Sequence, residues 1–208
     1  MGELAEDVTL LLLSTEEWRP LGYLHGDACR GAVCMAFLTE EWVSGGPPPT
    51  LDSLRRDMPK ESSTASPRAL ETLLGSGRVE LQKPQGRLAR IFSTGQAKYW
   101  RVVDQAGRQA IFDRITASLD GTPPPPLRDA TIAVILFASG KWERTGLDGP
   151  EPRPRVVAGP GLQPWGPRGA GAQQLATGTA VPLGVTQPYV LPLIARALQL
   201  GDRVSQMQ

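Results

Sequence analysis

The sequence predicts a mainly α-helical, compact domain that bears one β-hairpin and ends in a Pro/Gly-rich tail. Apolar residues recur every three to four positions in several segments, as they do on the buried face of a helix. One pair of short runs around a turn-forming tetrapeptide is typical of a hairpin. The 208 residues include 23 Gly and 20 Pro, a high share that indicates loop or tail. We expect the helical domain over residues 1–148 and the tail over 149–208.

The front of the chain favours three helical segments. Glu3–Leu13 carries acidic residues where the positive end of a helix dipole would lie. The segment from Asp27 to about Trp42 is rich in small residues, which let neighbouring helices approach closely, so we expect this helix to be central and buried. A Pro-rich loop at 45–49 then precedes one or two helical turns at Leu51–Asp57. A polar linker is expected over Glu61–Ser66.

The middle of the chain predicts a helix followed by the hairpin. The Ser66–Pro67 pair is expected to open the helix as cap and first residue, and the helix runs to about Gly75. Its inward-facing residues would be Leu70, Leu73 and Leu74. The hairpin is expected to pair Arg78–Gln82 with Arg87–Phe92 across the turn Lys83–Gly86.

Two further helices and the tail follow. Asp104–Leu119 is amphipathic, and Arg128–Lys141 is the most hydrophobic segment, with Gly140 as its end signal. Residues 149–192 contain too few apolar side chains to offset the entropy of ordering, so irregular structure is expected there. Tyr189–Val204 regains a helical stripe that would dock back on the domain. The stripe consists of Leu191, Ile194 and Leu198.

The composition excludes several classes of protein. A net charge of +1 argues against a general nucleic-acid binder. On one helix Cys29 and Cys34 would lie roughly 8–9 Å apart, too far for a disulfide, which favours a reducing compartment. One histidine and two cysteines cannot form a structural zinc site, and no apolar run approaches the roughly 18–20 residues of a spanning helix. The start also lacks the basic region of a signal peptide. These features predict a cytoplasmic protein with no transmembrane segment and no cofactor.

Four collinear segments resemble the Golgi phosphoprotein 3 family. They are LAEDVTLLLL at 4–13, CRGAVCM at 29–35, LETLLGSGRV at 70–79 and RDATIAVI at 128–135. The Ala/Gly/Pro/Arg-rich composition would suit a bacterial, actinobacterial member. The resemblance implies a helical core that binds phosphatidylinositol 4-phosphate or a similar anionic lipid at a cytoplasmic membrane surface. Beyond residue 151 the chain does not resemble the closing helices of the family.

The resemblance also implies a headgroup site. Arg30 falls on the arginine of the family's second helix, and Arg68 falls within the arginine cluster before the hairpin. Tyr23 is the nearest candidate for the aromatic residue of that site. Lys83 and Arg87 in the hairpin would add electrostatic attraction to anionic headgroups.

Each candidate has a simpler interpretation. Arg30 lies among apolar neighbours, so it would either be held for a phosphate or pair with Asp27 or Glu6. Arg68 would otherwise be a solvated residue at a helix start. The charges of the hairpin would also protect an exposed sheet edge.

Two other functions are compatible with the sequence. The chain would be a protein-interaction scaffold that self-associates through the hairpin, without a lipid. As a third hypothesis, His25 and Cys29 would act in an enzyme, although their spacing does not place them in contact. The tryptophans would anchor the protein at an interface or cap the core. They are Trp18, Trp42, Trp100, Trp142 and Trp165.

Overall fold

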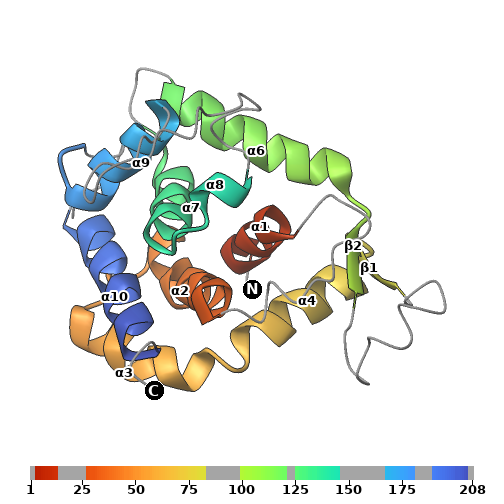
Figure 1. Cartoon of the computed structure of the whole chain (residues 1–208), viewed down its shortest axis with the longest axis horizontal. Helices are drawn as coiled ribbons and strands as arrows, with labels where there is room; N and C mark the ends of the chain where they lie inside the picture. The colour runs from red at the N-terminus through yellow and green to blue at the C-terminus, as the bar shows by residue number, and fades with distance from the viewer. Residues whose placement is uncertain are drawn as a thin grey trace, which may run out of the picture.

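Three helices lie at the centre of the fold, and the remaining elements surround them (Figure 1). A computed structural model describes residues 3–13, 27–82, 99–120, 125–145, 167–180 and 189–205. The inner helices are α1 (Glu3–Leu12), α2 (Asp27–Val43) and α7 (Leu127–Ala138). The surrounding elements are α3 (Leu51–Glu61), α4 (Ala65–Gly75), β1 (Val79–Gln82), β2 (Tyr99–Val102), α6 (Gln105–Asp120), α8 (Trp142–Thr145), α9 (Pro167–Thr177) and α10 (Val190–Ser205). The predicted fold class, mainly helical with one hairpin, is confirmed.

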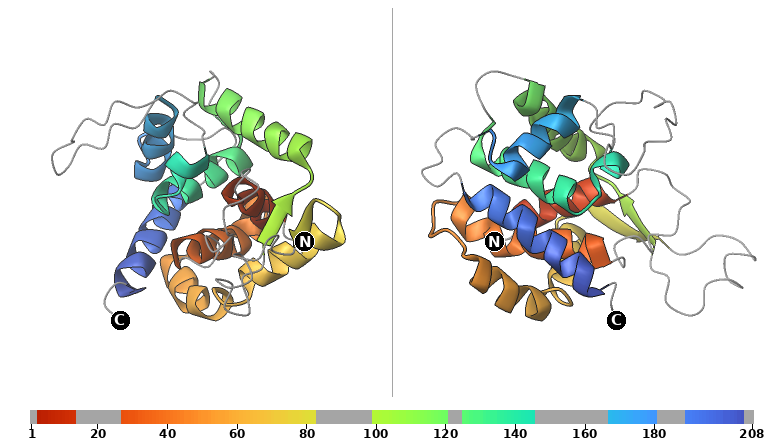
Figure 2. Two further views of the ribbon diagram at one scale, coloured as in Figure 1. Left: turned by 45° about the vertical axis from the view of Figure 1, so that its right-hand side comes forward. Right: turned by 60° about the vertical axis from the view of Figure 1, so that its left-hand side comes forward.

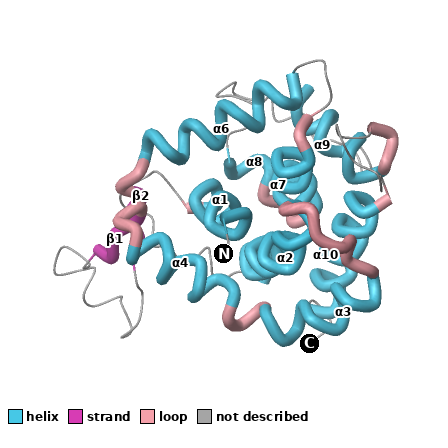
Figure 3. Tube along the Cα trace, turned by 180° about the vertical axis from the view of Figure 1, so that it is seen from behind, coloured by secondary structure: helices cyan, strands magenta, loops and turns pink. Residues whose placement is uncertain are grey.

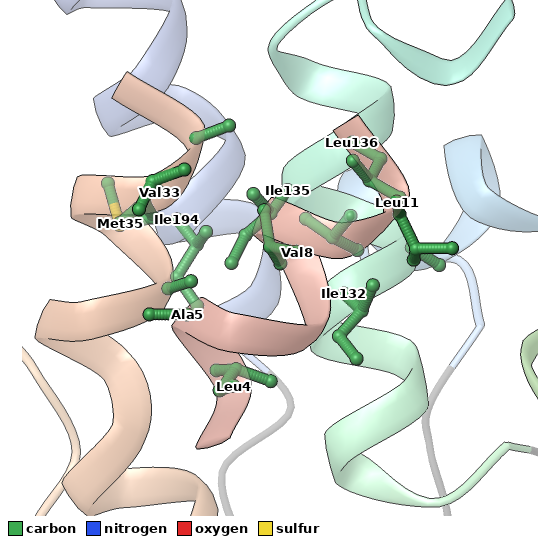
Figure 4. Packing of buried hydrophobic residues seen from close by; sticks show 14 of the residues in the cluster. Leu4, Ala5, Val8, Leu11, Val33, Met35, Ile132, Ile135, Leu136 and Ile194 are labelled. Carbon is green, nitrogen blue, oxygen red and sulfur yellow. The ribbon is translucent and has the colours of Figure 1, made fainter. Parts of the chain in front are cut away.

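Helix α1 is buried on almost every side, because it is enclosed by α2, α4, α6, α7 and α8. Leu4, Val8 and Leu11 point to different neighbours within one continuous apolar cluster (Figure 4). A helix that is apolar around most of its circumference is stable only when it is enclosed in this way. Its one buried hydroxyl, on Thr9, donates to the backbone oxygen of Ala5 at 2.6 Å.

The small-residue face of α2 is in the core, as predicted. Ala32 and Ala36 are fully buried, and the helix contacts α1, α3, α4, α7 and α10. Next to Gly31 the side chain of Leu198 approaches from α10, at a distance that leaves room for little more than a methyl group. Small side chains therefore allow one helix to pack against several others.

Helix α3 is longer than the predicted turn or two. Thr50 and Ser53 form a reciprocal cap, in which each backbone N–H donates to the other's hydroxyl, at 3.1 and 3.0 Å. This cap stabilises the first turn, and the helix continues through Pro59 to Glu61. It therefore occupies the start of the segment that the sequence predicted as linker.

The predicted cap of α4 is wrong. The helix begins at Ala65, so its cap is Thr64, and Ser66 lies inside the first turn. Ser66 is buried, and its hydroxyl oxygen has no hydrogen-bond partner. Leu70 and Leu73 face the core as predicted, but Leu74 is exposed.

The first predicted strand of the hairpin is confirmed as β1, but its partner is not the predicted one. β1 is antiparallel to β2, with Val79 opposite Val102 and Leu81 opposite Trp100. The segment that connects them covers residues 83–98, so the two strands are not neighbours across the turn Lys83–Gly86. That turn and Arg87–Phe92 lie outside the residues that the structure describes.

Helices α6 and α7 follow the predicted positions closely. Ile111 and Ile115 of α6 are buried, whereas Ala110 is exposed. Gly140 has a positive φ of 64°, and the following backbone N–H, of Lys141, donates to the oxygen of Leu136 at 2.9 Å. This left-handed glycine ends α7, as predicted.

The C-terminal helices join the core. The expectation of irregular structure is wrong for residues 167–177, which form α9 against α6 and α7. The predicted terminal helix is confirmed as α10, which lies along α2 and α7 (Figure 2). Its buried stripe includes the three predicted residues, Leu191, Ile194 and Leu198. The core therefore contains side chains from both sides of residue 148.

Candidate functional site

Arg68 in the first turns of α4 lies over an aromatic ring of α2. Its guanidinium carbon is 4.4 Å from the centre of the Phe37 ring, a distance at which the cation and the ring attract each other. The Arg68 side chain is 55% exposed. In the part of the chain that the structure describes, this guanidinium donates no hydrogen bond, and its one ion pair is with Glu61. The ring therefore lies against a guanidinium that is half-exposed and forms no hydrogen bond with the described residues.

Arg30 is on the same side of α2 as Phe37. The two residues are seven positions apart, or two helical turns, which separates their Cα atoms by about 10 Å along one face of the helix. Arg30 is half-buried. Glu6, one of the acids considered as its partner, lies 3.7 Å from Arg78.

Glu61 ends α3 beside the start of α4. Its Oε2 atom accepts a hydrogen bond from the Thr64 hydroxyl at 3.1 Å and lies 3.9 Å from Nη1 of Arg68. Helix α4 has no acidic residue in its first turn, and the Thr64 side chain does not cap it. A carboxylate from the preceding helix is therefore next to the positive end of the α4 dipole. Figure 3 shows α3 and α4 following one another along the edge of the molecule, next to α2.

Both cysteines of α2 are buried, and they form no disulfide with each other, as the spacing predicted. The Sγ atom of Cys34 is 3.6 Å from the backbone oxygen of Met58. Burial, together with the negative charge of Glu61, raises the pKa of Cys34 to about 12. This thiol is therefore protonated at neutral pH and is a poor nucleophile. Cys29 is also in the core, and His25, its partner in the enzyme hypothesis, lies outside the described ranges.

A second charged cluster, which the sequence did not predict, joins α1 to α6 and α7. Arg114 donates to Asp129 at 2.6 Å and to Asp7 at 3.2 Å. Arg128 donates to Asp7 at 3.0 Å, and Ser118 donates to Asp129 at 3.1 Å. The two carboxylates are buried, and each has an arginine partner. Each charge in this cluster is paired with an opposite charge of the cluster, so neither arginine is left to bind a ligand. The cluster instead holds α1 against α6 and α7, and we call it the clasp.

Removing Arg114 is expected to destabilise the fold strongly. Arg114→Ala would leave Asp129, whose side chain is 2% exposed, without its cation. We expect a loss of about 2–3 kcal/mol in the free energy of unfolding, measured by chemical denaturation. This is below the roughly 3–5 kcal/mol of a fully buried pair, because the arginine itself is 44% exposed. As a control, Arg56→Ala breaks a short but exposed ion pair with Asp57, and its midpoint should equal that of the parent. Equal midpoints for both variants would contradict a role for the clasp.

Other arginines fix the two ends of α1. Arg78 contacts Glu6 at 3.7 Å and Asp104 at 2.9 Å, which ties α1 to the residue before α6. Arg108 of α6 donates to the backbone oxygen of Leu10 at 3.0 Å, at the open end of the helix. Burial lowers the pKa of Arg108. Such a contact satisfies a carbonyl that the helix cannot pair internally.

The structure describes two of the five predicted headgroup residues. Arg30 is part of α2, and Arg68 lies against that helix, whereas Tyr23, Lys83 and Arg87 lie outside the described residues. Phe37 and Glu61 were missed. The only signal for Phe37 was its position two turns after Arg30, and nothing in the sequence placed either residue beside Arg68.

The hairpin carries an apolar pair beyond the core. Leu81 and Trp100 are directly opposite each other on the face that also holds the buried Val79 and Val102. Leu81 is 48% exposed. The other face bears Glu80 and Arg101, which are 3.4 Å apart.

Two kinds of feature are absent from the described residues. None of their helices combines the length and the apolar character needed to cross a membrane. They also contain no cluster of histidine, cysteine or acidic side chains that would hold a metal ion. Comparisons of the chain with protein-family models, curated proteins and solved structures find no match.

Proposed function

We propose that this protein binds an anionic phosphorylated lipid headgroup, similar to phosphatidylinositol 4-phosphate, at the cytoplasmic surface of a membrane. The observation that carries the proposal is the Arg68 side chain, which lies over the Phe37 ring, is 55% exposed and has only a long ion pair with Glu61 among the described residues. An arginine presents a planar fork that matches two oxygens of a phosphate. The resemblance to the Golgi phosphoprotein 3 family supports the choice of lipid.

The residues take different roles in this proposal. Arg68 makes the main phosphate contact, and Arg30, on the same face of α2 as Phe37, provides further positive charge. Tyr23 would contact the headgroup ring, as the resemblance implies. Lys83 and Arg87 would each add about 1 kcal/mol of attraction to an anionic bilayer.

Binding to vesicles tests the role of Arg68. Flotation would compare vesicles that contain phosphatidylinositol 4-phosphate with phosphatidylserine vesicles of equal total charge. Arg68→Ala is expected to weaken binding to the first about tenfold to a hundredfold, since it removes a hydrogen bond to a charged group. Phe37→Leu keeps the charge but removes the aromatic ring, so a loss of about two- to fivefold is expected.

The matched control is Arg55→Ala, which removes an exposed positive charge from α3. Its effect should be small and equal on both kinds of vesicle. If Arg68→Ala binds like the parent, or no more weakly than Arg55→Ala, the proposed site is wrong.

Self-association through the hairpin is the second candidate. The exposed Leu81 beside Trp100 favours this function, because such an apolar pair can pack against the same pair on a second copy of the chain. Salt distinguishes the two functions. Lipid capture through arginines fades as salt screens the charges, whereas apolar association persists.

A further inference from the structure

The Glu61 carboxylate occupies the place where a phosphate would meet Arg68. It lies 3.9 Å from Nη1 of Arg68 and accepts a hydrogen bond from Thr64, the cap residue of α4. These two neighbours and the positive end of the helix dipole are the features that attract an oxyanion to a protein surface. The carboxylate of Glu61 is therefore an internal stand-in for an anionic ligand.

The ion pair between Glu61 and Arg68 is weak compared with others in the same protein. Its single contact of 3.9 Å is beyond hydrogen-bond distance, and the Glu61 side chain is 32% exposed. Arg114 and Asp129, in contrast, are 2.6 Å apart, with the carboxylate buried. An exposed pair of this length contributes little to stability, so an incoming anion can displace it at small cost.

We propose that Glu61 competes with the phosphorylated ligand for Arg68 and thereby sets both the affinity and the selectivity of the site. The inference rests on the proposed function and adds to it a residue that acts against binding. A ligand with a single carboxylate would bring Arg68 the same charge and the same acceptor oxygens that Glu61 already provides, so it would not displace Glu61. A phosphomonoester carries a charge of about −1.5 to −2 and three acceptor oxygens, so it can replace Glu61 and also form the two-pronged contact. The site would therefore select phosphomonoesters over singly charged anions.

Neutralising Glu61 tests this inference. Glu61→Gln keeps an acceptor for Thr64 but removes the negative charge. Binding to phosphatidylinositol 4-phosphate vesicles is expected to become about two- to fivefold tighter, as expected from the loss of one exposed ion pair. The gain should be larger on phosphatidylserine vesicles, because discrimination against other anions falls. Titration with inorganic phosphate separates recognition of the phosphate itself from attraction to the bilayer.

Two further variants make the test specific. Asp57→Asn removes an acid one turn earlier on α3, where it pairs with Arg56 and Lys60 instead of Arg68, and it should leave binding unchanged. The double variant Glu61→Gln with Arg68→Ala should show no gain over Arg68→Ala alone, because the competitor acts through Arg68. Glu61→Ala repeats the test without the amide, and thermal denaturation confirms that each variant is folded.

The outcomes separate this inference from the proposed function. If Arg68→Ala weakens binding but Glu61→Gln does not strengthen it, the competitor role is wrong and the lipid site stands. Equal gains from Glu61→Gln and Asp57→Asn would also overturn the role, since they would show a general effect of surface charge. If Arg68→Ala has no effect on binding, both proposals fall.

Discussion

A chain cut after residue 148 is expected to lose cooperative unfolding. The deletion would uncover the faces of α2 and α7 that α9 and α10 now cover. Burial of a large aliphatic side chain contributes about 1.5–3 kcal/mol, and five of them would be lost. They are Leu175, Val190, Leu191, Ile194 and Leu198. Their combined contribution is comparable to the whole stability of a typical domain, about 5–15 kcal/mol.

Circular dichroism during thermal denaturation would measure this loss. The whole chain should show one sharp transition, and the fragment a broad one or none. A point variant tests the same interface without a deletion: Ile194→Asp places a charge at a fully buried position of α10. The control is Arg196→Asp, on the exposed side of the same helix, which should keep the parent's transition. A fragment 1–148 that unfolds as sharply as the parent would show that the domain is complete at the expected boundary.

Trp142→Ala is expected to give the largest loss among single truncations of the core. Trp142 is the first residue of α8, and its side chain is the largest of the fully buried ones among the described residues. Helix α8 lies against α1 and α7. Removing so large a ring leaves a cavity that the surrounding helices fill only in part. We expect a loss of about 3–5 kcal/mol, which corresponds to a fall in melting temperature on the order of 10 °C.

Calorimetry or denaturant titration would measure the effect of Trp142→Ala. Trp142→Phe should lose less, because it keeps an aromatic ring in the same place. Leu74→Ala is the control, since that side chain is exposed and its removal should cost under about 1 kcal/mol. A similar loss in Leu74→Ala and Trp142→Ala would show that α8 does not anchor the core.

The inner helices could be predicted from the sequence, because their signals are local. Apolar spacing marks α1 and α7, small residues mark α2, and Gly140 marks the end of α7. The stripe of α10 was visible for the same reason. The role of Trp142 could not be decided from the sequence, which allowed it to be either a core residue or an interface anchor. The structure shows that it is a core residue, because its side chain is fully buried.

The missed elements depend on contacts between distant residues. β2 has four residues without a turn signal, and it pairs with β1 across a 16-residue connection that no local pattern reveals. α9 has a Gly- and Ala-rich composition with weak helical preference, and packing of Ala172 and Leu175 against the domain stabilises it. Tertiary contacts, more than local sequence preference, therefore determine that β2 and α9 form.

The candidate site was predictable only in part. The resemblance pointed to Arg68, but its surroundings come from α2, which is distant in the chain, and from the last residue of α3. Phe37 lies within the segment predicted as the central helix, and Glu61 begins the segment predicted as a linker. Only the fold brings the ring and the carboxylate next to the same guanidinium.

The position of α10 on α2 has a consequence for how the protein is made. The ribosome releases α2 long before it has synthesised its covering helix, since about 150 residues separate the two. At roughly 5–20 residues per second, the apolar side of the earlier helix waits on the order of ten seconds for its partner. During that interval the nascent chain exposes apolar surface, which makes it prone to aggregate until the last helix has been made.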